Sequence, residues 1–156
     1  KPLAGIDHAS VAEAIRKTGH AQVVLADSEH DLAPLVATLA RPGDLVIGIT
    51  QSGETADTLA AMRVARERPN VPIITLTPIP ATARRLALAW GQHCVLTPNA
   101  NSLEDMIDTA CDFASSQGFA EEGQRIIITV GVPLGEPGAT NMLRIAQVGK
   151  PRAAKN

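Results

Sequence analysis

Short apolar runs alternate with longer amphipathic patterns along this chain, and the alternation constrains its fold more than any other feature. The runs are apolar at consecutive positions rather than at every second one, which is typical of parallel strands buried on both faces. Helices must then cover both faces of the sheet. The expected strands occupy residues 22–26, 45–50, 71–77, 94–97, 125–130 and 141–148.

Amphipathic helices are expected between these strands. The clearest begins at the N-cap residue Ser102 and ends at Gly118, with an apolar stripe along one side. The other helices are expected to begin at or near residues 10, 31, 54 and 81, and the last two of them to end near Arg68 and at Trp90. Together these elements predict an α/β fold, a three-layer α/β/α sandwich around a Rossmann-like, mostly parallel sheet of about six strands.

The connection into the last expected strand, residues 133–140, is rich in glycine and proline. It is too short for an ordinary crossover helix, so the last strand is expected to be antiparallel and to lie at an edge of the sheet. Because 156 residues fit the usual size of one domain, residues 1–149 are expected to form a single α/β domain. Residues 150–156 are expected to form a disordered tail.

The composition argues against several classes of partner. Aromatic residues make up only 2% of the chain, so no stacking surface for single-stranded nucleic acid is expected. The net charge of −2 does not suit binding to a phosphate backbone either. No apolar run approaches the roughly 20 residues of a membrane span. Neither a nucleic acid nor a membrane is therefore an expected partner.

The two cysteines, Cys94 and Cys111, lie in apolar stretches and do not form a CxxC pair. We expect reduced, buried thiols rather than a disulfide, which favours a cytoplasmic location. The first residues lack the apolar region of a signal peptide, so no export signal is expected there.

The turn after the expected strand at 45–50 is the first candidate binding site. Its sequence, TQSGET, leads from a buried strand into a helix, where free backbone N–H groups carry partial positive charge. A glycine allows the chain to turn tightly, and hydroxyl and amide side chains add donors. The pattern predicts a phosphate or sugar-phosphate site, and an ordinary serine N-cap with a glycine turn fits it as well. The expected ligands are Thr50, Gln51, Ser52, Gly53 and Thr55.

A second glycine-rich loop follows the strand at 125–130 and should open on the same edge of the sheet, where the carboxyl ends of parallel strands meet. Gly135 and Gly138 would let backbone amides approach a ligand there; the alternative is a plain connector. Arg84 and Arg85, on the helix after the third strand, either supply positive charge to the site or are solvated helix residues.

The sequence contains no recognisable catalytic or metal-binding arrangement, and no metal or cofactor is expected. Glu54 is the one acidic residue close to the first turn, and we expect it in the first turn of the following helix, stabilised by the helix dipole. Nucleotide-binding glycine motifs are missing as well. We therefore do not expect an enzyme. The histidines are scattered without metal-ligand spacing, at His8, His20, His30 and His93.

Residues from about 62 to 149 closely resemble the C-terminal domain of bacterial pyruvate kinases. The resemblance is carried by RVARERPNVPIITLTPIPATARRLALAWG at 63–91, and by MIDTACDFA and GVPLGEPGATNMLRI further on. It implies a regulatory rather than a catalytic domain, which binds sugar phosphates at the loop after its first strand. The segment 50–55 matches that family's T-x-S-G-x-T pattern. The loop at 135–138 lies where the family closes its effector pocket.

Two other stretches resemble different families. QSGETADTLAAM, at 51–62, is similar to the sugar-isomerase (SIS) domain of glucosamine-6-phosphate synthase, which implies phosphate ligation by Gln51, Ser52 and Thr55. GIDHASVAEAIRKTGH and LVATLARPGDLVIGI, within 1–49, resemble the C-terminal domain of UDP-N-acetylmuramate–alanine ligase. Three resemblances, joined near residues 50 and 62, indicate a chimera, that is, an engineered or recombined scaffold.

We therefore expect a scaffold without catalytic turnover that keeps weak phosphate or sugar-phosphate binding. One alternative is a natural stand-alone regulatory domain that senses a sugar phosphate. The other is a sugar-phosphate isomerase with Glu54, Glu136 or His93 as its base. The kinase-like part implies the strand order fourth, third, second, fifth, sixth, with the first strand beside the sixth or otherwise beside the fourth. A free edge there is expected to allow a homodimer.

Overall fold

The computed structural model describes residues 23–25, 32–51, 62–63, 65, 67, 70–88, 93–100, 102–132, 134 and 140–149. The helix expected from Ser10, most of the helix expected before Arg68 and the expected tail at 150–156 lie outside the described residues. The extent of the domain, 1–149, therefore remains a prediction.

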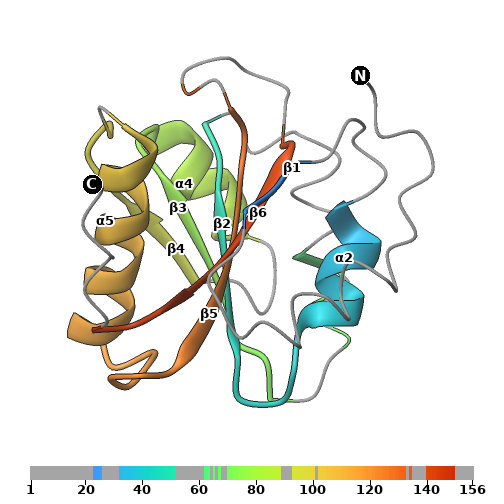
Figure 1. Ribbon diagram of the computed structural model, residues 1–156. Helices are drawn as coiled ribbons and strands as arrows, with labels where there is room; N and C mark the ends of the chain where they lie inside the picture. Colours follow the sequence, from blue (N-terminus) through green and yellow to red (C-terminus); the bar gives the residue numbers. More distant parts are fainter. Residues whose placement is uncertain are drawn as a thin grey trace, which may run out of the picture.

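The described strands form one six-stranded sheet in the order β1-β6-β5-β2-β3-β4 (Figure 1). Parallel pairs join β2 to β3, β2 to β5 and β3 to β4, whereas β6 is antiparallel to both β5 and β1. The strands are β1 (Val23–Leu25), β2 (Leu45–Ile49), β3 (Ile73–Thr77), β4 (His93–Leu96), β5 (Arg125–Val130) and β6 (Met142–Gln147).

This topology confirms the implied strand order, the antiparallel direction of β6 and the position of β1 beside it. The prediction that β6 lies at an edge is wrong, because β1 pairs with its outer side from Val23 to Leu25. A strand from the N-terminal part of the chain covers that side, so the outer strands of the described sheet are β1 and β4.

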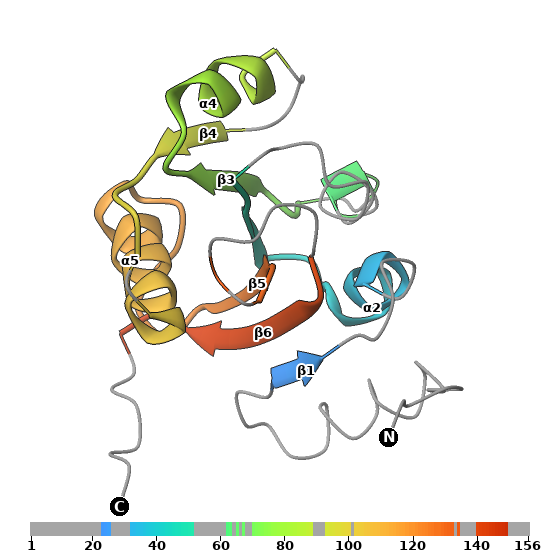
Figure 2. The same cartoon turned by 90° about the horizontal axis from the view of Figure 1, so that it is seen from above.

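Helices cover the sheet on both sides, which confirms the three-layer sandwich (Figure 2). Helix α2 (Leu32–Leu39) and a short helical stretch that includes Met62 pack on one face, and α5 (Leu103–Ser116) packs on the other. Helix α4 (Pro80–Leu86) lies beside β3 and β4. It is shorter than the expected helix at 81–90, since the chain turns at 87–88.

Strand β2 contributes apolar side chains to the hydrophobic cores on both faces of the sheet. All five of its residues are buried. Val46 contributes to the core under α2, whereas Leu45 and Ile47 contribute to the core under α5. Successive side chains of a strand point to opposite faces, so a strand covered on both sides must be apolar at every position.

The ends of α5 follow from its sequence. Ser102 is in an extended conformation, and its hydroxyl accepts a hydrogen bond of 3.1 Å from the Asp105 N–H, as an N-cap residue does. After the helix, Gly118 adopts a φ of 72°, which glycine tolerates without strain. Both predicted boundaries of this helix are confirmed.

A buried ion pair ties the turn before β2 to the start of β5. The Arg125 Nε donates to Asp44 Oδ1 at 3.0 Å, and its Nη2 donates to the other carboxylate oxygen and to the Leu39 carbonyl. The Arg41 N–H adds a hydrogen bond of 2.8 Å to the Asp44 carboxylate. These bonds offset the cost of removing the carboxylate from water.

Both cysteines are free, as expected, but half-buried rather than buried. Cys94 lies on the outer strand β4, and Cys111 lies on α5 and packs at the margin of the core. Within the described parts of the chain, no helix has the length and apolar character needed to cross a bilayer.

Candidate functional site

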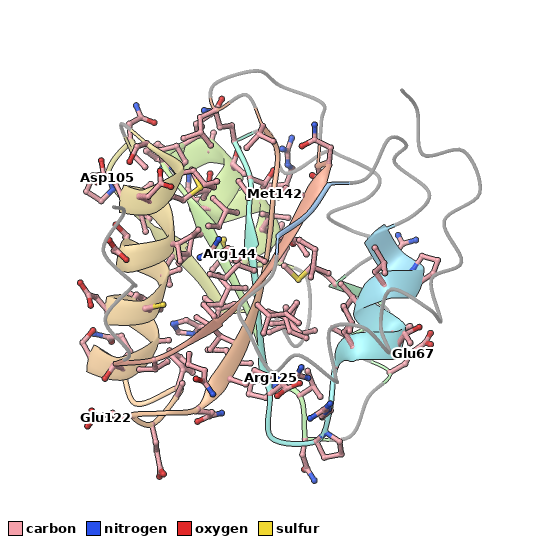
Figure 3. All side chains as sticks on the ribbon, in the orientation of Figure 1. Glu67, Asp105, Glu122, Arg125, Met142 and Arg144 are labelled. Atoms are coloured by element: carbon pink, nitrogen blue, oxygen red, sulfur yellow. The ribbon has the colours of Figure 1, made fainter. Side chains whose placement is uncertain are left out.

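The carboxyl ends of β2 and β5 flank the point where the order of the sheet reverses. From β2 the sheet continues outward through β3 to β4, whereas β5 lies on the opposite side of β2 and leads to β6. In open α/β sheets, ligands bind outside the carboxyl ends of the strands at such a switch point. Figure 2 looks down on this edge; in Figure 3, Met142 marks it and Arg125 marks the opposite edge.

Two residues of the predicted phosphate turn, Thr50 and Gln51, leave β2 at this point. Thr50 is buried, and its N–H donates to the Leu76 carbonyl of β3 at 3.1 Å, which keeps the strand end in the sheet. Gln51 is half-buried, and its backbone carbonyl oxygen accepts a hydrogen bond of 2.7 Å from the Thr82 hydroxyl of α4. The backbone where the turn begins is therefore fixed from two sides.

The side chain of Asn141 fixes the second predicted loop where it leaves the sheet. The Val132 N–H donates to Asn141 Oδ1 at 2.8 Å, and Asn141 Nδ2 donates to the Val132 carbonyl at 2.7 Å. Val132 and Leu134 are partly buried against the core under α5. Both ends of the loop between Val132 and Asn141 are thus held together beside the end of β2.

Two buried hydroxyls lie just inside this edge. Thr75 of β3 and Thr129 of β5 are both register partners of Gly48 on β2, so they flank a residue without a side chain. Their side chains are 1% and 0% exposed, and neither hydroxyl has a hydrogen-bond partner in the described structure. By strand alternation they face the same side of the sheet as Ile73 and Ile127, the side of α2.

The remaining predicted ligands, Ser52, Gly53, Thr55, Gly135 and Gly138, lie outside the described residues. The site is therefore defined by Thr50 and Gln51 on one side and by the ends of the 133–140 loop on the other. Thr82 and Asn141 were not among the predicted site residues. Their partners lie 31 and 9 residues away in the sequence, so no local pattern marks either contact.

Of the other residues considered for charge or catalysis, the structure describes Arg84, Arg85 and His93. Arg84 and Arg85 are exposed in the last turn of α4, where a positive charge stabilises a helix C-terminus. His93 begins β4, at the amino ends of the parallel strands, and its ring centroid lies 4.8 Å from that of Phe119. Glu54, Glu136 and the remaining histidines lie outside the described residues.

Metal-ligating and titratable side chains add little at the site. The described part of the chain contains no group of three His, Cys, Asp or Glu residues arranged to hold a metal ion. Burial raises the pKa of the Cys94 thiol, and a hydrogen bond from the Val95 backbone opposes that rise. Cys94 lies on β4, away from the switch point, so this thiol is no part of the site.

Comparison with known proteins identifies one family across most of the chain. The model of the pyruvate kinase alpha/beta domain matches residues 40–146. The pyruvate kinase of Methylorubrum extorquens is 47% identical over 110 residues, which are 70% of this chain and 22% of that protein. The pyruvate kinase of Sporosarcina psychrophila is 29% identical over 146 residues, 94% of this chain and 24% of that protein.

A solved structure shows the same fold. The crystal structure of a pyruvate kinase from Cryptosporidium parvum matches with a TM-score of 0.58 and 23% sequence identity, over 92% of this chain and 26% of that one. The chain thus spans about a quarter of the length of these relatives or less.

Proposed function

Because the chain belongs to the pyruvate kinase alpha/beta domain family, we propose that it is a regulatory domain that binds phosphate or a sugar phosphate and has no catalytic turnover of its own. The observation that carries this proposal is the convergence of two backbone segments, Thr50–Gln51 and Gly131–Val132, at the switch point between β2 and β5. Parallel α/β sheets bind ligands at this position.

Backbone amides supply the affinity in this proposal. Ser52, Gly53 and Thr55 follow Gln51 at the start of the expected helix, where N–H groups and hydroxyls can donate to phosphate oxygens. The segment with Gly135 and Gly138 begins after Val132 and ends before Asn141, and its backbone amides would supply further donors. Amide donors carry no net charge, so this site suits a ligand that brings its own negative charge, as a phosphate ester does.

The proposal does not need a recombined chain. The family model runs from residue 40 to residue 146 without a break at residues 50 and 62, the two expected junctions. A single pyruvate kinase aligns with 94% of the chain. The resemblances of 1–49 to a ligase and of 51–62 to a sugar-isomerase domain remain interpretations of the sequence alone, and the binding proposal rests on neither.

A titration of the ¹⁵N-labelled protein followed by NMR tests the binding proposal. We expect inorganic phosphate, a hexose 6-phosphate and a hexose 1,6-bisphosphate to shift the amide signals of residues 50–55 and 131–141, whereas the unphosphorylated hexose leaves them unchanged. The Ser52→Ala variant should bind more weakly, and Ser115→Ala, on an exposed position of α5, should bind like wild type. Unchanged amide signals at millimolar phosphate ligand would refute the proposal.

The same samples separate a binding domain from an isomerase. The isomerase alternative needs a base near the site, and the structure places His93 at the opposite edge of the sheet. Only Glu54 and Glu136 then remain as candidates. We expect no interconversion of glucose 6-phosphate and fructose 6-phosphate; turnover that disappears in Glu54→Gln or Glu136→Gln would replace the binding-domain proposal with an enzyme.

A further inference from the structure

The antiparallel ladder between β5 and β6 continues past its last backbone pair through a side chain. The last paired residues are Val130 and Met142, so the next hydrogen-bonded pair in this register would be Val132 with Thr140. Instead, the amide of Asn141 makes both hydrogen bonds to Val132. A primary amide offers the same donor and acceptor as a peptide group, so it can replace a backbone pair.

These two hydrogen bonds join Val132 to Asn141, the residues on either side of the 133–140 loop, and we call this pair the neck of the loop. The residues between them, 133–140, include two prolines and two glycines. A glycine-containing segment loses conformational entropy when a ligand fixes its backbone, and that loss weakens binding. Holding the two ends of the loop together in the free protein removes part of this loss before the ligand arrives.

The neck also lies beside the other half of the site. Ile49 is the register partner of Val130, so Thr50–Gln51 and Gly131–Val132 leave the sheet from the ends of neighbouring parallel strands. Thr82 holds Gln51 from α4, and Asn141 holds Val132 from β6. One side-chain contact thus fixes the backbone on each side of the switch point.

We propose that Asn141 is a positioning residue that holds the Val132 backbone beside the end of β2 and so controls the affinity for phosphate ligands. This inference rests on the proposed function. Asn141 need not touch the ligand, because its amide donor and its carbonyl acceptor are both engaged with Val132. Its effect is transmitted through the Val132 backbone to the loop.

The test combines hydrogen exchange of the free protein with ligand titration. In Asn141→Ala, we expect the Val132 amide to exchange roughly tenfold faster and the dissociation constant of a hexose 1,6-bisphosphate to rise roughly three- to tenfold, as fits the loss of two hydrogen bonds. Asn141→Asp keeps an acceptor for the Val132 N–H but sets a carboxylate against the Val132 carbonyl. We expect it to weaken binding at least as much as alanine does.

Gln147→Ala is the matched control, since it removes an amide from the opposite end of the same strand. It should leave both the Val132 exchange and the dissociation constant unchanged. Unchanged exchange of the core amides of Ile127 and Ile128 verifies that each variant is folded, because both residues are fully buried in β5.

The outcomes distinguish a failure of the role proposed for the Val132–Asn141 neck from a failure of the proposed binding function. Unchanged Val132 exchange in Asn141→Ala overturns the neck, whatever the wild-type protein binds. Faster exchange with an unchanged dissociation constant overturns the control of affinity and leaves the binding site in place. If the wild-type protein binds no phosphate ligand, the proposed function fails, and the control of affinity fails with it.

Discussion

The hydroxyl of Thr82 joins two elements that the sequence separates by 31 residues. It is buried and donates to the Gln51 carbonyl at the start of the turn that is predicted to bind phosphate. Thr75 and Thr129 are equally buried threonines whose hydroxyls find no partner among the described residues. One type of side chain thus occurs in two environments, which lead to opposite expectations for the same substitution.

The effect of a threonine-to-valine replacement on the free energy of unfolding should therefore differ in sign between these positions. We expect Thr82→Val to lower the free energy of unfolding by about 1–3 kcal/mol, because it leaves the half-buried Gln51 carbonyl without its donor. Thr75→Val should be neutral or raise it by up to about 1 kcal/mol, because it removes an unpaired buried hydroxyl. Urea denaturation measures both, with Thr82→Ser as the variant that keeps the hydrogen bond. A destabilised Thr75→Val would show that its hydroxyl has a partner.

The ion pair between Asp44 and Arg125, at the amino ends of the parallel strands, is a second contact that is expected to determine stability. We expect Asp44→Ala to lower the free energy of unfolding by roughly 3 kcal/mol, because it leaves the Arg125 guanidinium unpaired and removes the acceptor of the Arg41 N–H. This is the low end of the usual range, since the Arg125 side chain is 19% exposed. Thermal unfolding of the two single variants and of Asp44→Ala/Arg125→Met completes a double-mutant cycle; additive effects would contradict the coupling.

The Cys94 thiol should react more slowly in the folded protein than in the unfolded chain. Burial raises its pKa, so less of the reactive thiolate is present near pH 8.5. Cys111→Ala leaves Cys94 as the single thiol, and its rate of alkylation by iodoacetamide against pH should reach half-maximum at a higher pH than in denaturant. The same shift contributes stability below the unfolded-state pKa, which is lost as the pH rises through the folded-state pKa. Coincident pH profiles would rule this out.

At the scale of elements, the N-cap residue Ser102 stabilises the start of α5. We expect Ser102→Ala to lower the free energy of unfolding by about 1 kcal/mol, because the Asp105 N–H loses its acceptor. Ser115→Ala, at an exposed position near the other end of the helix, serves as the control and should change stability by no more than about 0.5 kcal/mol. Guanidinium denaturation provides the measurement; equal effects of the two variants would mean that the cap is not needed.

The sequence was most informative where burial decides the structure. β5 occupies the expected residues, because a continuous apolar run has only one place in a two-faced sheet. The sequence predicts a longer α4, because apolar residues continue the helical pattern after Leu86. In the structure the helix ends at Leu86, and Leu88 is 86% exposed. Periodicity reports which residues are apolar, but it does not report whether another element covers them.

The strand ends that carry the two candidate segments were predictable, but the contacts that support these segments were not. The turn at Thr50 and the loop after β5 follow from the rule that ligands bind at the carboxyl ends of parallel strands. The contacts of Thr82 and Asn141 depend on which elements become neighbours in space. Gly131–Val132 and Thr50–Gln51 likewise leave neighbouring strand ends only because β5 inserts beside β2.

For the whole molecule, the expected homodimer is best tested at the outer strand β4. Its sequence, HCVL, carries no lysine or proline that would discourage edge pairing, and Leu96 is 55% exposed. We expect concentration-dependent self-association that Leu96→Lys abolishes, whereas Leu88→Lys, an exposed leucine outside the strand, changes it less. Light scattering coupled to size-exclusion chromatography gives the mass of each variant. A monomer at every concentration would refute self-association through β4.

Because β1 pairs with β6 in the antiparallel direction, β1 could follow β6 in the order of the chain instead of preceding all other strands. Since Val23 lies opposite Arg144 and Leu25 lies opposite Met142, β1 pairs with the first half of β6. An engineered connection from the end of β6 at Gln147 back to Val23 would make β1 follow β6 in the chain, and the chain could instead be opened between β1 and α2. The molecule thus admits a circular permutation in which ribosomal synthesis ends, rather than begins, with that strand.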